Sequence, residues 1–243
     1  MKLYPIVSIL VIIHFTYWFL HFLGLPIATE IYLYGVGSNL HVSLGEYWRL
    51  LTSIFLHLDL THALFNSFSL VIFGPALERM LGKIRFLFVY FGAGIIGNIA
   101  TFYLEPLRYT HLGASGAIYG LLGVYIFMII FRKHLMDHGS SQIVKTILIF
   151  GVLMSLIGRK INIVAHFGGF AGGFLLAPLV LRNVRPFSTW ITYRRRYPSD
   201  GGEISFDPNR WQKKRRIPEI IRKNWLWIII GILALIGLLS RFN

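Results

Sequence analysis

The residues of this sequence that could do chemistry are a serine, two histidines and an asparagine in three separate apolar stretches. Ser115 and His166 are the residue types that form a nucleophile and its general base, in which the imidazole takes the hydroxyl proton. His62 and Asn66 are four residues apart, so on a helix they share one face, and both can donate hydrogen bonds. With the backbone N–H of Ser115 at a helix N-terminus, they would stabilise the oxyanion of an acyl transfer. The combination predicts a serine hydrolase site.

Each of these residues also has an ordinary structural explanation when it is taken singly. A serine at a helix start is usually an N-cap. A histidine in a membrane helix more often bonds a neighbouring helix than catalyses a reaction. The catalytic interpretation is favoured because several such groups are expected at one depth in a membrane, where polar side chains are costly and usually functional.

Small residues follow both the serine and the second histidine. Gly116 and Gly120 form one pair spaced four apart, and Gly169 and Gly173 form another. Such pairs let two helix backbones approach closely. Close approach is what a short serine side chain needs to reach an imidazole on another helix.

A tyrosine can orient the imidazole, whereas no carboxylate is suitably placed to do so. Tyr119 lies four residues after Ser115, on the same helical face, so its ring can pack against His166. Glu78 directly follows the second membrane stretch, and it is expected at the opposite end of its helix from the serine. We therefore expect a Ser-His dyad rather than a triad.

The composition indicates a membrane protein. Hydrophobic residues make up 55% of the chain and charged residues only 14%, against about 25% charged residues in soluble domains. A soluble protein would have to hide most of its surface, so that class is excluded. We predict an all-α polytopic membrane protein, with helices at residues 4–24, 61–77, 86–104, 115–131, 146–157 (with a start nearer Gln142), 164–181 and 225–240.

The first of these helices is interpreted as a retained span. Its uncharged run is too long for the apolar region of a signal peptide, and no small-residue cleavage site follows it. With the N-terminus in the cytoplasm, 19 of the 24 Lys and Arg residues are cytoplasmic, as the positive-inside rule requires. The second, fourth and sixth helices then enter from the outer face. His62, Ser115 and His166 are therefore expected at similar depth beneath that face.

The net charge of +14 is concentrated late in the chain, where 12 of the 24 basic residues lie between Arg182 and Lys223. This pattern is typical of a cytoplasmic loop that can adhere to anionic lipid, rather than of a nucleic-acid partner. The predicted organisation is a six-helix core at residues 1–181, a basic linker at 182–224 and an added membrane helix at 225–243. Residues 25–60, the longest outer connection, are expected to form short amphipathic segments that are partly buried.

Transport and metal chemistry fit the sequence less well. His14 and His21 share a face of the first helix, as relay histidines would, but no Asp or Glu accompanies them. His134 and His138 have a ligand-like spacing in a polar loop, but no H-E-x-x-H motif is present. The chain has no cysteine, so thiol nucleophiles, disulfides and cysteine metal sites are excluded. We expect no metal and no cofactor.

Five segments of the sequence resemble, in order, motifs of the rhomboid family of intramembrane serine proteases. The Gly-x-Ser-Gly motif alone is a weak signal, whereas five motifs in order across residues 47–173 are a strong one. The segments are Tyr47-Trp48-Arg49, His62 to Asn66, Gly74 to Glu78, Gly113 to Gly116, and Ala165-His166 followed by Gly169 and Gly173.

The resemblance implies a role for each matching residue. The implied roles are Ser115 as nucleophile, His166 as base, His62 and Asn66 as oxyanion donors, Tyr119 stacked on the base, Gly113, Gly116, Gly169 and Gly173 as supporting residues, and Arg49 and Glu78 as structural residues. It also implies single-pass membrane proteins as substrates, admitted near the fifth helix and cut in or beside the membrane. The basic inner loop fits a bacterial-type plasma membrane. The alternative within this fold is a non-enzymatic relative that binds membrane clients, although such relatives typically lack the serine or the histidine.

Overall fold

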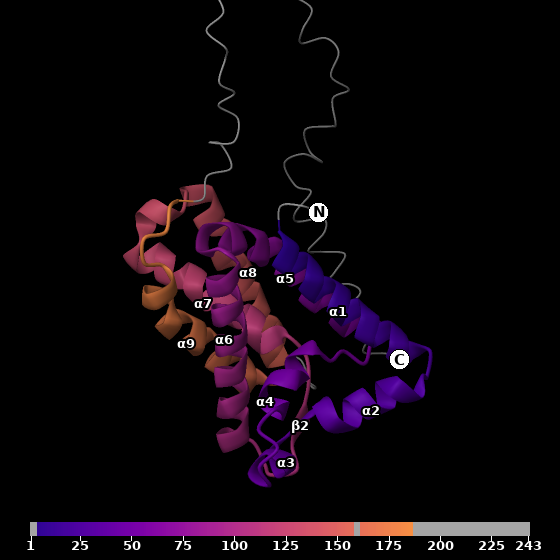
Figure 1. Cartoon of the computed structure of the whole chain (residues 1–243). Helices are drawn as coiled ribbons and strands as arrows, with labels where there is room; N and C mark the ends of the chain where they lie inside the picture. Colours follow the sequence, from indigo (N-terminus) through magenta and orange to yellow (C-terminus); the bar gives the residue numbers. More distant parts are fainter. Residues whose placement is uncertain (1–3, 158–160, 187–243) are drawn as a thin grey trace, which may run out of the picture. The chain divides into compact units, whose positions relative to one another are not determined.

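The computed structural model describes residues 4–157 and 161–186, which form mainly long helices (Figure 1). The long helices are α1 (Pro5–Phe22), α5 (Leu60–Leu81), α6 (Lys83–Leu104), α7 (Ser115–Phe131), α8 (His138–Ile157) and α9 (Ile163–Val180). The short elements are α2 (Pro26–Gly35), β1 (Gly37–Ser38), α3 (Asn39–Ser43), α4 (Arg49–Thr52), the 3₁₀ turns η1 (Ser53–Phe55) and η2 (Lys133–Leu135), and β2 (Thr110–His111).

Several helices have the length and composition of membrane spans. Among the described residues, α1, α5, α6 and α9 are each long and apolar enough to cross a membrane, and α7 is a shorter apolar helix. The predicted all-α polytopic class is confirmed. The predicted seventh helix, 225–240, and most of the basic linker lie outside the described residues.

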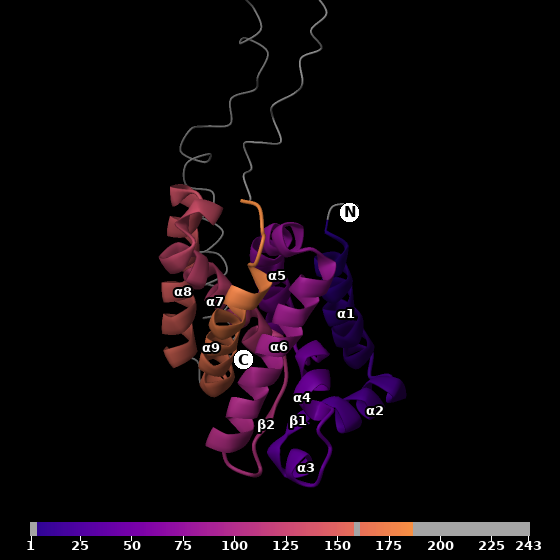
Figure 2. The ribbon, with the colours of Figure 1, turned by 60° about the vertical axis from the view of Figure 1, so that its left-hand side comes forward.

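Helices α7 and α9 pack backbone to backbone, and α6 contacts both (Figures 1 and 2). A Cβ atom on Gly169 would overlap the backbone of Gly116, and one on Gly173 would overlap the backbone of Gly120. The two pairs of small residues therefore lie opposite one another across this interface, where their missing side chains allow the close approach. Helix α8 packs on α7, and α1 packs on α5.

Two predicted helix boundaries are wrong. The fifth long helix, α8, begins at His138 rather than at 142–146, because the Asp137 carboxylate accepts hydrogen bonds from the backbone N–H (2.9 Å) and hydroxyl (2.7 Å) of Ser140 and so caps the helix. Helix α5 continues beyond residue 77, through Pro75, to Leu81. It ends at Gly82, whose φ of +77° suits glycine.

The connection between α1 and α5 consists of the short, partly buried segments α2, β1, α3, α4 and η1, and it is joined to the segment between α6 and α7. β1 pairs with β2, with Gly37 opposite His111. The buried Arg49 side chain forms an ion pair with Glu46 at 2.6 Å and donates a hydrogen bond to the Val36 carbonyl at 2.9 Å. The β1–β2 pairing joins the connection to the segment before α7, whereas the Arg49 contacts lie within the connection and stabilise its own shape.

Glu78 joins the end of α5 to the start of α1. Its two carboxylate oxygens accept hydrogen bonds from the backbone N–H groups of Ile6 and Val7, each at 3.0 Å. The first N–H groups of a helix have no partners within the helix, and a carboxylate there also suits the helix dipole. Glu78 therefore caps α1 and lies far along α5 from His62.

Candidate active site

Ser115 is the first residue of α7, and Ala114 occupies the N-cap position without a side-chain capping bond. The ordinary interpretation of this serine as an N-cap is therefore wrong. Its backbone N–H is one of the first-turn donors that have no partner within the helix. The half-buried side chain lies at the end of the bundle where α7 and α9 both begin.

His166 lies in the first turn of α9, which the Asn162 side chain caps by accepting a hydrogen bond from the Ala165 N–H at 2.9 Å. A Cβ atom on Gly116 would lie 3.2 Å from the Ala165 carbonyl oxygen. The residue after the serine and the residue before the histidine are therefore in contact across the interface. Within residues 4–157 and 161–186, no hydrogen bond joins the Ser115 hydroxyl to His166.

Two side chains orient the imidazole of His166. The Tyr119 ring is stacked on it, with centroids 4.2 Å apart and an angle of 12° between the planes. The Ser155 hydroxyl on α8 lies 2.8 Å from Nδ1 of the imidazole. Sequence analysis missed Ser155, although a buried serine within an apolar stretch is the kind of polar membrane residue that signals a partner.

Gly113 brings the turn before Ser115 against helix α5. Its φ is +111°, and a Cβ atom there would lie 2.5 Å from two ring atoms of His62 and 3.3 Å from Nδ2 of Asn66. The imidazoles of His62 and His166 are also close enough to interact electrostatically. The starts of α5, α7 and α9 thus gather the polar residues that the sequence singled out.

Comparison with known proteins identifies the family. Residues 44–183 match the Rhomboid domain family. The chain belongs to the rhomboid family. Over 184 residues it is 51% identical to the Bacillus subtilis (strain 168) protein named "Putative rhomboid protease YdcA", a match that covers 74% of this chain and 91% of that protein.

More distant relatives match the same region of this rhomboid. It is 40% identical over 148 residues to "Rhomboid protease GluP" of B. subtilis, covering 59% of this chain and 28% of that protein. It is 30% identical over 171 residues to "Rhomboid-like protease 2" of Toxoplasma gondii, covering 70% of this chain and 60% of that protein. Together with its apolar helices, the family makes this rhomboid a multi-pass integral membrane protein.

A second residue missed by sequence analysis, His57, orients Asn66. The Asn66 amide nitrogen lies 2.9 Å from Nε2 of His57, and Nδ1 of His57 lies 3.3 Å from the Phe55 carbonyl oxygen. Burial, and then the neighbouring His14 and His62, lower the pKa of His57 to about 2 from 6.5, so its ring is neutral. The neutral ring donates from Nδ1 and accepts from Asn66, which leaves the second amide N–H of Asn66 for another acceptor.

An apolar cavity of about 180 Å³ adjoins the imidazole between α7, α8 and α9. Its polar lining is limited to Tyr119, Ser155 and His166, and the remaining walls are aliphatic and aromatic: Leu148, Val152, Phe167 and Phe170. Such a lining suits an apolar side chain held beside a small number of polar groups. The cavity therefore lies between the imidazole of His166 and helix α8.

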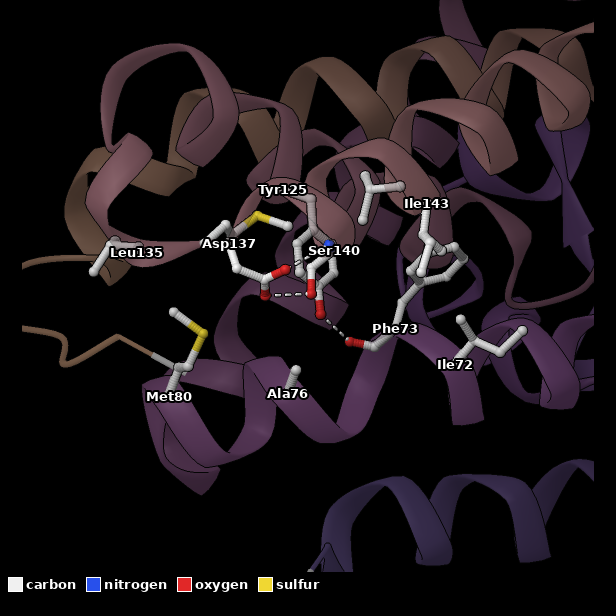
Figure 3. A pocket seen from close by; sticks show the side chains of 11 residues that line it. Ile72, Phe73, Ala76, Met80, Tyr125, Leu135, Asp137, Ser140 and Ile143 are labelled. Carbon is white, nitrogen blue, oxygen red and sulfur yellow. Dashed lines mark hydrogen bonds between the residues drawn. The ribbon is translucent and has the colours of Figure 1, made fainter. Parts of the chain in front are cut away.

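A cavity of similar volume at the opposite end of α5 and α7 contains none of the candidate site residues (Figure 3). Tyr125 donates a hydrogen bond to the Phe73 carbonyl at 2.8 Å on one side of it, and Asp137 is paired with Ser140 on another. The hydrogen bonds that Asp137 accepts from the hydroxyl and the backbone N–H of Ser140 hold the pKa of its carboxyl below the ordinary value. Each polar group there already has a local partner.

The histidines considered for transport or metal binding are dispersed. His14 is completely buried, whereas His21, His134 and His138 are exposed. In the part of the chain that the structure describes, no group of three or more His, Cys, Asp or Glu side chains is arranged to hold a metal ion.

Proposed function

We propose that this rhomboid is an intramembrane serine endopeptidase that hydrolyses peptide bonds in or beside the transmembrane segments of other membrane proteins. Ser115 is the nucleophile and His166 the general base. The observation that carries the proposal is the close packing of the first turns of α7 and α9, with a serine free of a capping role on one and an oriented imidazole on the other.

The reaction follows from the chemistry of these groups. Nε2 of His166 takes the proton as the Ser115 oxygen attacks the substrate carbonyl carbon, and it then returns this proton to the leaving amine. In the second half-reaction His166 takes a proton from water as the water oxygen attacks the acyl carbon, and the ester bond to Ser115 then breaks as His166 returns the proton to the serine oxygen. The stacked Tyr119 ring restricts rotation of the imidazole throughout.

His62, Asn66 and the Ser115 N–H supply the oxyanion donors of this mechanism. The packing of Gly113 against the first two residues supports this assignment, because it brings the turn before the serine to the side chains that would donate. The loss of one such donor typically reduces the rate by about 10²–10³-fold.

The substrates we propose are single-pass membrane proteins. The apolar cavity beside His166 supports this class, because a side chain from a membrane helix is apolar and can occupy it from the side of α8. The first test is cleavage of a tagged single-span protein in proteoliposomes by wild type and Ser115→Ala. We expect the variant to lose at least about 10³-fold in rate, and cleavage at the wild-type rate would refute the assignment.

In the topology that we propose, the chain lies in a bacterial plasma membrane with its N-terminus on the cytoplasmic side. The basic linker then lies near anionic lipid. The site then opens to the outer face. Because the chain contains no cysteine, single cysteines can be introduced and labelled from one side of the membrane without background. A cysteine at exposed Gly45 should react from outside, and reaction only from inside would contradict this topology.

A further inference from the structure

Ser155 is a buried hydroxyl in the described part of α8 with three close polar neighbours. Its oxygen lies 2.8 Å from the carbonyl oxygen of Gly151, 2.9 Å from the hydroxyl of Tyr119 and 2.8 Å from Nδ1 of His166. Serines in helices often bond the carbonyl four residues earlier, which explains the first contact alone. The other two contacts come from α7 and α9 and need a different explanation.

The protons of this cluster can be assigned by counting. A serine hydroxyl has one proton to donate and two lone pairs to accept with. The Gly151 carbonyl can only accept, so the single Ser155 proton goes to it. The serine oxygen must then accept from both remaining neighbours, the Tyr119 hydroxyl and an N–H at Nδ1 of His166.

This assignment fixes the tautomer of the imidazole. A neutral histidine with its proton on Nδ1 has its lone pair on Nε2, which is the form that can take a proton from another group. In Ser-His-Asp enzymes a buried carboxylate accepts from Nδ1 and sets this tautomer. Among the hydrogen bonds of the described residues, no Asp or Glu side chain reaches His166, so the hydroxyl of Ser155 occupies the equivalent position.

We propose that Ser155 is a positioning residue that holds His166 in the tautomer and orientation of a general base. This inference rests on the proposed function for its catalytic consequence, although the tautomer itself does not. A neutral hydroxyl is a weaker acceptor than a carboxylate, so its loss should cost much less than the roughly 10⁴-fold seen when a triad carboxylate is replaced.

The test compares Ser155→Ala and Ser155→Thr with a control on the same helix. Ser141 also bonds the carbonyl four residues earlier, at 2.9 Å from the Asp137 oxygen, but it does not contact the imidazole. Ser141→Ala therefore removes the same kind of helical bond without touching the base. We expect Ser155→Ala to lower kcat about 10-fold with KM unchanged and to slow fluorophosphonate labelling of Ser115 by a similar factor. Ser155→Thr should restore both rates to within about 3-fold, because it keeps the hydroxyl, and Ser141→Ala should match wild type.

A nitrogen-15 NMR spectrum of the histidine rings, with His166 assigned by comparison with His166→Gln, reads the tautomer without any cleavage. Wild type should show the proton on Nδ1, and Ser155→Ala should show a mixture of tautomers. A wild-type His166 protonated on Nε2, or full kcat and labelling in Ser155→Ala, would overturn the inference. An inactive wild type with the proton on Nδ1 would overturn the proposed function and leave the role of Ser155 intact.

Discussion

Replacing Gly113 with alanine is expected to disable the site while leaving the fold in place. At its φ of +111°, an L-residue is strained by roughly 1–2 kcal/mol. The new methyl group would lie 2.5 Å from two ring atoms of His62, about 1 Å closer than an ordinary carbon contact. The imidazole or the turn before Ser115 must therefore move by about that distance.

The size of the effect follows from what this displacement does to the reaction. A misplacement of about 1 Å at a reacting group can cost about 10²-fold in rate, as can the loss of one oxyanion donor. We therefore expect kcat/KM for a single-span substrate in proteoliposomes to fall about 10²-fold, mostly in kcat.

Gly45 supplies the matched control. Its φ is +101°, and a Cβ atom there would meet nothing within 4 Å. Gly45→Ala introduces similar backbone strain without a clash, so it should lose some thermal stability and keep the rate, whereas Gly113→Ala should lose at least as much stability and also lose the rate. If the two variants cleave equally well, the contact between Gly113 and His62 does not position the site, and the reasoning fails.

Three further predictions follow from single contacts. Tyr119→Phe keeps the stacked ring but loses the hydroxyl at Ser155, so the cleavage rate should fall only about 3-fold. Tyr119→Leu loses the ring as well, so its cleavage rate should fall at least about 10-fold. Equal losses of rate in the two variants would show that the ring contributes nothing. Glu78→Gln leaves one of two backbone amides at the start of α1 without its acceptor. The free energy of unfolding in detergent should therefore fall by about 1–3 kcal/mol, while the cleavage rate per folded molecule stays unchanged. A loss of rate without a loss of stability would contradict a structural role. Burial and then the neighbouring histidines lower the pKa of His57 to about 2, so near pH 6.5 the unfolded chain binds a proton that the folded protein does not. The contribution of His57 to the free energy of unfolding is therefore complete above that pH and falls below it by up to about 1.4 kcal/mol per pH unit. The thermal midpoint measured between pH 8 and 5 should fall less steeply in His57→Gln than in wild type, and equal slopes would refute the role of this group.

Much of the bundle could be predicted from the sequence because its signals are local. Long uncharged runs mark the helices, and the glycine pairs after Ser115 and His166 mark the α7–α9 interface, since only glycine allows that backbone contact. The early start of α8 was missed because Lys145 interrupts the apolar run, whereas the helix is set by the capping carboxylate of Asp137.

The orienting residues could not be predicted because their partners are set by tertiary packing. His57 meets Asn66 only because the segment between η1 and α5 folds back onto α5, and Ser155 meets His166 only because α8 packs beside the start of α9. Neither pair has a characteristic spacing in sequence, and a serine or histidine in an apolar stretch indicates only that some partner exists.

The most direct test of the central claim is the rate at which a fluorophosphonate labels the folded protein in lipid, with the modified residue identified by mass spectrometry. The adduct should form on Ser115, and His166→Asn should slow its formation at least about 10²-fold. An adduct on another residue, or an unchanged rate in His166→Asn, would show that this hydroxyl and this imidazole do not act together.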